Sequence, residues 1–137
     1  MKIVICGSMK LSKKMIDAKT KLEALGHELI LPRHTEEYAA MNTSDHIHSE
    51  SVKNKVNNDL IRGYYHKIAD SDAILVINDT LNDIDGYIGG NAFLEMGFAF
   101  VLNKTIYLLN NIPALGYRDE LEAMQPIVIN NDYSKIK

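Results

Sequence analysis

Five short runs rich in Ile, Val and Leu constrain the fold of this chain more than any other feature. They cover residues 2–6, 27–32, 73–78, 105–110 and 127–130. Several are apolar at successive positions, as in parallel strands that are covered on both faces. Segments with helical patterning alternate with them, at 11–26, 46–69, 90–102 and 115–124. We therefore expect a single α/β domain over residues 1–137, with one open, doubly wound parallel sheet of five strands and helices on both faces.

A ligand of such a Rossmann-like or flavodoxin-like sheet binds beyond the carboxyl ends of the strands, where the strand order reverses. Two loops in such positions, 33–45 and 79–90, are long enough to form binding elements. Gly26 suits the C-terminal end of the first helix, and Ser44 or Asp45 could cap the second.

The composition of the chain argues against nucleic-acid polymers and membranes as partners. The chain has 137 residues, of which 46% are hydrophobic and 24% charged, and a net charge of −3. It has no block of Lys and Arg that would follow a phosphate backbone, so nucleic-acid polymers are not expected as partners. It has no apolar run of the roughly 20 residues that a membrane span requires. The single cysteine, Cys6, cannot form an internal disulfide and fits a cytoplasmic location.

The first candidate site element is the turn after the first predicted strand. Gly7 would let the backbone approach a ligand, and Ser8 and Ser12 supply hydroxyls. Lys10 adds a positive charge, and the N-terminus of the following helix adds free N–H groups. These groups suit one phosphate. The alternative is an ordinary strand-to-helix turn with a serine cap.

The second candidate is Glu95, the one charged residue in the apolar segment 90–102. A buried carboxylate needs hydrogen-bond donors or a cavity. We expect Glu95 to face a cleft near the start of its helix, where Gly89, Gly90 and Asn91 would let a ligand come close. The alternative is an ion pair with Lys104 or a backbone cap.

Asp59 is the third candidate. A helix over 46–69 would bury a stripe of apolar residues, and Asp59 would border this stripe. The stripe consists of Val52, Val56, Leu60 and Tyr64. The alternative is a solvated charge at the helix edge, and Arg62 and Lys67 are expected at the surface. If Asp59 and Glu95 share a cleft, they form a carboxylate pair, and such pairs perform glycosyl chemistry.

Neither a metal nor another cofactor is expected. His46 and His48 follow Asp45 at a predicted helix start, which favours a solvated first turn over a metal site. Candidates to stack on an aromatic ligand are Tyr38, Met41, Tyr64, Tyr65 and Tyr87, although such residues more often pack in the core.

These motifs resemble those of the nucleoside 2-deoxyribosyltransferase-like superfamily, which includes deoxyribosyltransferases and nucleoside 5′-monophosphate N-glycosidases. The resemblance spans nearly the whole chain and is strongest in the Glu-x-Gly-x-Ala signature that begins at Glu95. It implies that Glu95 attacks C1′ to form a covalent glycosyl–enzyme, and that Asp59 contacts the sugar and assists proton transfer. The turn Gly7-Ser8-Met9-Lys10 is similar to the phosphate-binding turn of the monophosphate hydrolases.

The chain departs from the superfamily pattern before the nucleophile. Gly89 stands where an acidic residue often meets the base, and Asp83 or Asp85 is the candidate to replace that residue. Gly90 and Asn91 stand where the hydrolases often carry a hydroxyl. The stretch also faintly resembles the Gly-Gly-x-Gly-Thr-x-x-Glu loop of cytokinin-activating phosphoribohydrolases.

The resemblance implies an N-glycosidase acting on a nucleoside 5′-monophosphate, with a small nucleotide or nucleoside as partner. It also implies a homodimer or larger homo-oligomer, for which segment 46–69 is the predicted interface. The alternatives are a nucleoside 2-deoxyribosyltransferase, a nucleotide-binding module without chemistry, and a flavodoxin-like scaffold for protein interaction.

Overall fold

The computed structural model describes residues 1–40 and 59–137 of this chain. Its strands are β1 (Lys2–Gly7), β2 (Glu28–Ile30), β3 (Ala73–Ile77), β4 (Thr105–Leu108) and β5 (Ile127–Val128). Its α-helices are α1 (Ser12–Ala24), α2 (Thr35–Ala39), α4 (Leu60–Ala69), α5 (Gly90–Val101) and α6 (Arg118–Ala123). Short 3-10 helices are η1 (Met9–Leu11) and η2 (Tyr133–Lys135).

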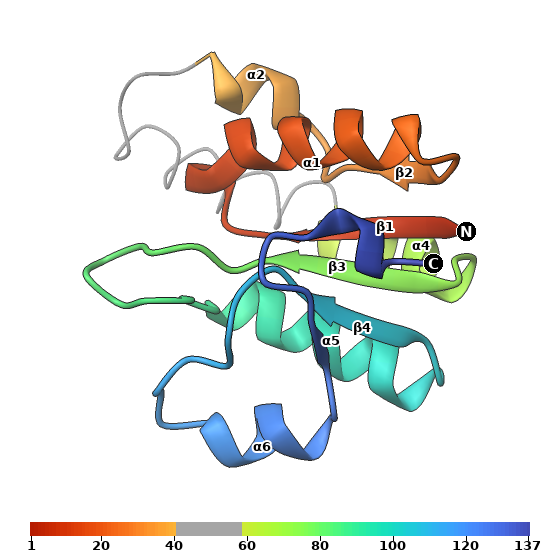
Figure 1. Cartoon of the computed structure of the whole chain (residues 1–137). Coiled ribbons are helices and arrows are strands. Elements are labelled where there is room, and N and C mark those ends of the chain that lie inside the picture. The colour runs from red at the N-terminus through yellow and green to blue at the C-terminus, as the bar shows by residue number, and fades with distance from the viewer. Residues whose placement is uncertain (41–58) are drawn as a thin grey trace.

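The five strands form one parallel sheet in the order β2-β1-β3-β4-β5, which confirms the predicted α/β fold (Figure 1). The chain moves outward from β1 to β2, then returns to add β3 on the other side of β1. The strand order therefore reverses between β1 and β3, where Gly7 pairs with Ile77 at the carboxyl end of both strands. This crevice is where ligands of such sheets bind.

Both faces of the sheet are buried, which explains the successive apolar residues in its strands. Ile3 and Ile5 of β1 pack into one core with α1 and η2. Val4 and Cys6, which point to the other face, pack into a second core with α4, α5 and α6. Among the described residues, no helix is long and apolar enough to cross a membrane.

Within the described residues the predicted elements are present, most of them with shorter boundaries, whereas β1 is one residue longer at its carboxyl end. The first helix ends where expected, because Gly26 has φ +94° and its N–H donates to Glu23 O while that of His27 donates to Leu22 O. Of the predicted helix 46–69, the structure describes α4. The predicted caps Ser44 and Asp45 lie outside the described residues. So do Met41, His46, His48, Val52 and Val56.

The sequence does not predict helix α2, whose five residues lie inside the predicted loop 33–45. A single turn and a half gives too few residues to display helical periodicity. Tyr38 of this helix is buried.

Candidate active site at the β1–β3 crevice

A cavity of about 530 Å³ lies at the carboxyl ends of β1 and β3. Its size is typical of sites for small molecules. Its described walls come from the turn after β1, the segment after β2, helix α4, the loop after β3, and the first turns of α5. The lining residues are Gly7, Ser8, Met9, Lys10, Pro32, Arg33, Tyr38, Leu60, Ile61, Gly63, Tyr64, Lys67, Leu81, Asn82, Tyr87, Gly89, Gly90, Asn91, Ala92 and Glu95.

The turn after β1 has the form that the sequence predicted for an anion site. Gly7 has φ +150°, and a Cβ there would lie 3.0 Å from Met15 Cε and 3.1 Å from Ile77 O, so a larger residue would not fit. The Ser8 hydroxyl accepts a hydrogen bond of 3.2 Å from the Lys10 N–H, so its own proton can be donated to a ligand. Residues 7–10 all line the cavity.

Ser12, the other predicted residue of this turn, does not line the cavity in the described structure. It begins α1, is 3% exposed, and is absent from the described cavity wall. The helix turns this side chain toward the packed face of α1, because the 3-10 turn η1 intervenes between the strand and the helix.

Glu95 lies in the second turn of α5, is 5% exposed, and lines the cavity. The charge of Glu95 acts on two buried groups, the Cys6 thiol and the Tyr64 hydroxyl. Burial, followed by the Glu95 charge and a hydrogen bond with it, raises the pKa of the Cys6 thiol well above its usual value. Burial, followed by the charges of Cys6 and Glu95, raises the pKa of Tyr64. The Tyr64 hydroxyl donates to Ile5 O, which ties α4 to β1 beside the carboxylate.

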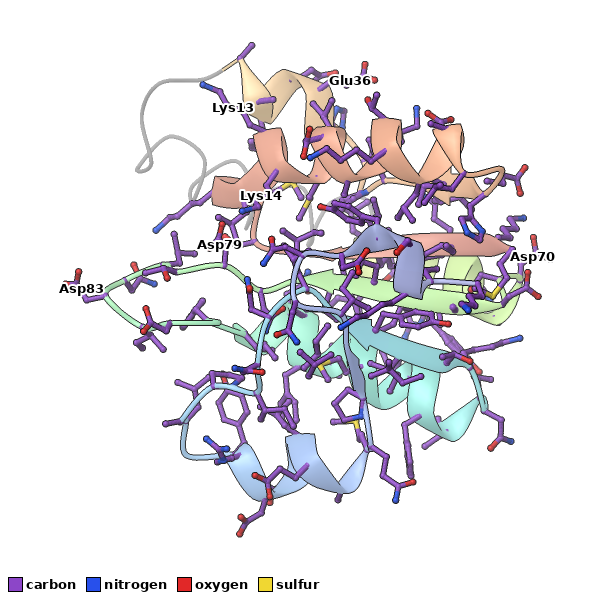
Figure 2. All side chains as sticks on the ribbon, viewed as in Figure 1. Lys13, Lys14, Glu36, Asp70, Asp79 and Asp83 are labelled. Atoms are coloured by element: carbon purple, nitrogen blue, oxygen red, sulfur yellow. The ribbon has the colours of Figure 1, made fainter. Side chains whose placement is uncertain are left out.

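The environment of Glu95 supports the cleft over the alternative partner. Lys104 follows the opposite end of α5, and its charge acts instead on Asp70 at the far end of the sheet (Figure 2). At the near end of α5, Gly89 occupies the N-cap position with no side-chain cap. A Cβ at Gly90 would meet no atom of the described residues within 4 Å, so a ligand can approach the backbone there.

The position of Cys6 leads to a prediction. Because the thiol is fully buried and its pKa is raised, it should resist iodoacetamide in the native protein at pH 8.5 and react fully in denaturant. The free energy of unfolding should also decrease as pH rises above the usual thiol range of about 8.5, because the unfolded thiol ionises first. Mass spectrometry of labelled protein and urea titrations at several pH values check both expectations. Rapid native labelling would contradict them, and Cys6→Ala is the control for the pH dependence.

Asp59 lies at the N-terminal end of α4. Its side chain is 54% exposed and forms an ion pair of 2.7 Å with Arg62, which lowers the pKa of this carboxyl. It is absent from the described cavity wall, whereas the next residues, Leu60 and Ile61, are part of it. The reason is local: Asp59 precedes α4 with φ +48°, and this conformation turns its side chain outward to Arg62.

The loop after β3 does not bring an acidic residue to the cavity. Asp83 lies at the loop tip, pointing away from the body of the protein (Figure 2). Asp85 accepts a hydrogen bond of 3.0 Å from Thr80 Oγ1 and lines a different, more open hollow beside Asn110. The loop reverses direction between Leu81 and Ile84, so its two aspartates face away from the crevice.

Two cations of the cavity were not predicted as site residues. Arg33 comes from the segment after β2, and Lys67, which was expected at the surface, comes from the last turn of α4. The Lys67 ammonium lies 5.5 Å from the centre of the Tyr64 ring. Arg33 directly follows a predicted strand, and this position was the one feature of the sequence that could have indicated a site residue. Nothing in the sequence indicated Lys67, because its place at the cavity depends on which face of α4 packs against the sheet.

The charges of the described wall are therefore unbalanced. Lys10, Arg33 and Lys67 face one carboxylate, Glu95, a net charge of +2 with each group ionised. None of the three cations has an ion pair with a described residue, whereas Lys14 pairs with Asp79 at 2.7 Å just outside the cavity (Figure 2). A wall with this charge suits an anionic ligand.

Three of the predicted aromatic residues lie at the cavity. Tyr38, Tyr64 and Tyr87 line the cavity. Tyr65 does not, because its ring packs edge-on against Phe98 at 5.3 Å. Within residues 1–40 and 59–137, no group of three or more His, Cys, Asp or Glu could hold a metal ion.

Comparison with known proteins gives a likeness of fold. No protein-family model and no curated protein sequence matches this chain. Among solved structures, that of the Clostridium botulinum CMP N-glycosidase, BcmB, matches with a TM-score of 0.55 over 99% of this chain and 98% of that chain, at 17% sequence identity. This chain is therefore an α/β protein with the fold of that CMP N-glycosidase, as its Gly-Ser turn and its Glu-x-Gly-x-Ala signature indicated.

Proposed function

We propose that this protein is an N-glycosidase that cleaves the base–sugar bond of a nucleoside 5′-monophosphate. One observation carries the proposal: the buried carboxylate Glu95 lines a ligand-sized cavity whose other described charges are cations. A carboxylate in such a place can attack an anomeric carbon. The likeness of fold to a CMP N-glycosidase supports the same class of reaction.

The charge of the wall favours a nucleotide over a nucleoside. A phosphate monoester carries about −1.5 to −2 charges at pH 7, which offsets the net positive charge of the described wall. The Ser8 hydroxyl and the Lys10 ammonium, on one turn, supply a donor and a charge for it. A neutral nucleoside would leave the net positive charge of the described wall without a counter-charge.

The proposed reaction has two steps. Glu95 attacks C1′, a C1′–O bond forms as the C1′–N bond breaks, and the electron pair of that bond leaves with the base, which takes up a proton. Water then attacks C1′, the glycosyl ester breaks, its electron pair returns to the Glu95 carboxylate, and the water's proton passes to solvent. The role of Asp59 in proton transfer stays a prediction, since that residue lies outside the described wall.

The test is a panel of ribo- and deoxyribonucleosides and their 5′-monophosphates, incubated with the protein and analysed for free base by chromatography. We expect base release from one or more monophosphates and little from the matching nucleosides. Release only when a second base is added would indicate a transferase. No release from any compound would overturn the proposal.

Lys10→Gln should raise the KM for the monophosphate by about tenfold and leave kcat nearly unchanged, because the lost contact is with the phosphate and not with the reacting atoms. The matched control is Lys13→Gln, an exposed lysine three residues along the chain that does not line the cavity (Figure 2). Steady-state kinetics at two salt concentrations check this. An equal effect of both substitutions would contradict a phosphate site at this turn.

The assembly belongs to the proposal as well. We propose a homodimer in which the exposed apolar side chains of α4 and α5 are covered. These are Ile61, Leu94, Phe100 and Val101, with exposed fractions between 41% and 72%. Ile61 is the one of these four residues that belongs to the predicted interface segment 46–69, of which residues 59–69 are described. Sedimentation velocity measures the assembly, and a monomer at all concentrations would contradict it.

We further propose a cytoplasmic location, consistent with the single reduced thiol.

A further inference from the structure

The loop after β3 holds Tyr87 between two fixed neighbours. Gly86 has φ +69°, and a Cβ there would lie 2.7 Å from Asn111 O, so the backbone is packed directly against the segment after β4. Ile88, on the other side, is 1% exposed and its carbonyl accepts a hydrogen bond from the Tyr117 hydroxyl. The Tyr87 N–H itself donates to Asp79 O at 3.2 Å. The backbone thus fixes the direction of the Tyr87 side chain before any ligand binds.

The Tyr87 ring lies over Gly89 at the start of α5. A Cβ at Gly89 would be 3.3 Å from Tyr87 Cε1 and 3.4 Å from its hydroxyl oxygen. The phenol therefore lies directly beside the space that a side chain at position 89 would take, and both residues line the cavity. The Tyr87 ring presents an aromatic face and a hydroxyl group beside position 89, which is six residues before Glu95.

The Tyr87 hydroxyl differs from those of two nearby tyrosines. Tyr64 donates to Ile5 O and Tyr117 donates to Ile88 O. In the described part of the chain, no hydrogen-bond partner exists for the hydroxyl of Tyr87, which is half-buried. A half-buried phenol at a cavity wall is thus available to a ligand as donor or acceptor.

The charges indicate which part of a nucleotide would meet this ring. Residues 79–91 contain no Lys or Arg. Among the described residues, the cations of the cavity come from the turn after β1, the segment after β2, and α4. A phosphate belongs on that side, which leaves the uncharged end of the ligand for the wall formed by Tyr87.

We propose that Tyr87 is a specificity-determining residue that contacts the base of the bound nucleotide, with its ring against the base and its hydroxyl on a base edge. This inference rests on the proposed function and names the part of its substrate that Tyr87 recognises. Stacking of a base on an aromatic side chain contributes enough to change affinity by tenfold or more.

The test compares the binding of nucleoside 5′-monophosphates with that of ribose 5-phosphate, which has the phosphate and the sugar but no base. Calorimetry on Tyr87→Ala should show nucleotide affinity at least tenfold weaker and ribose 5-phosphate affinity unchanged. Tyr87→Phe should keep most of the affinity and lose discrimination among bases. Lys10→Gln should weaken both ligands, and Tyr65→Phe, which alters a tyrosine outside the cavity wall, should weaken neither.

A second variant guards against misfolding of Tyr87→Ala. Gly89→Ala keeps the tyrosine but crowds its ring, because the new Cβ approaches it to 3.3 Å and the ring must shift by a few tenths of an ångström. It should weaken nucleotide binding severalfold in the wild type and have no further effect in the Tyr87→Ala background. Thermal melts confirm that each variant is folded.

The outcomes separate this inference from the proposed function. If the wild type binds nucleotides but releases no base, the proposed function fails and the binding comparison still decides the role of Tyr87. Equal weakening of ribose 5-phosphate and nucleotide by Tyr87→Ala would overturn contact with the base, as would no change in either. If the wild type binds no nucleotide at all, both are overturned.

Discussion

Replacing Glu95 by glutamine should abolish base release, with kcat reduced by about a thousandfold or more, because the neutral amide cannot attack C1′. Nucleotide affinity should stay the same or increase. The substitution removes the one negative charge of the described cavity wall and keeps the shape of the side chain. The effect should therefore appear in kcat and not in the dissociation constant, which calorimetry measures directly.

The matched control is Glu36→Gln, on the exposed outer side of α2 (Figure 2), which should leave both constants unchanged. The covalent step has its own readout. Acid quenching of the wild type during turnover should leave a glycosyl ester on the peptide that contains Glu95, detectable by its added mass. Retained turnover in Glu95→Gln would exclude this residue as the nucleophile.

Asn78→Ala should destabilise the protein by about 3 kcal/mol, because several buried hydrogen bonds are lost together. Asn78 follows β3 and is fully buried. Its amide nitrogen lies 3.0 Å from Asn110 O, 3.2 Å from Asn111 O and 3.4 Å from Gly86 O, and its Oδ1 accepts from the Asn110 N–H at 2.9 Å. Alanine would leave these backbone groups without partners.

Urea unfolding measures this effect, with Asn131→Ala as the control. Asn131 is exposed and makes one side-chain hydrogen bond, to Asn110 Oδ1, so its loss should cost less than about 1 kcal/mol. The Asn78 amide also hydrogen-bonds Gly86 O, so its loss should displace the adjacent Tyr87. The Asn78→Ala protein that remains folded should therefore bind nucleotide less tightly. Equal stability of the two variants would contradict the structural role of the buried amide.

The two predictions depend on features that the sequence revealed to different degrees. Glu95 was recognisable because a single carboxylate in an apolar helix requires a partner or a cavity. Gly7 and Ser8 were recognisable because they directly follow a strand that is apolar at successive positions. Asn78 gave no such signal, since an asparagine at the end of a strand is equally common in an exposed turn.

The sequence by itself determined the alternation of strands and helices, the burial of both sheet faces, and the presence of Glu95 at the start of α5. These are local properties, because periodicity and turn residues report on the neighbouring few residues. The tertiary structure alone decided that Arg33 and Lys67 converge on the cavity and that Tyr87 lines it beside Gly89. Those outcomes depend on the order of the strands in the sheet and on the face that each helix packs against it, and both are set by contacts between residues far apart in the chain.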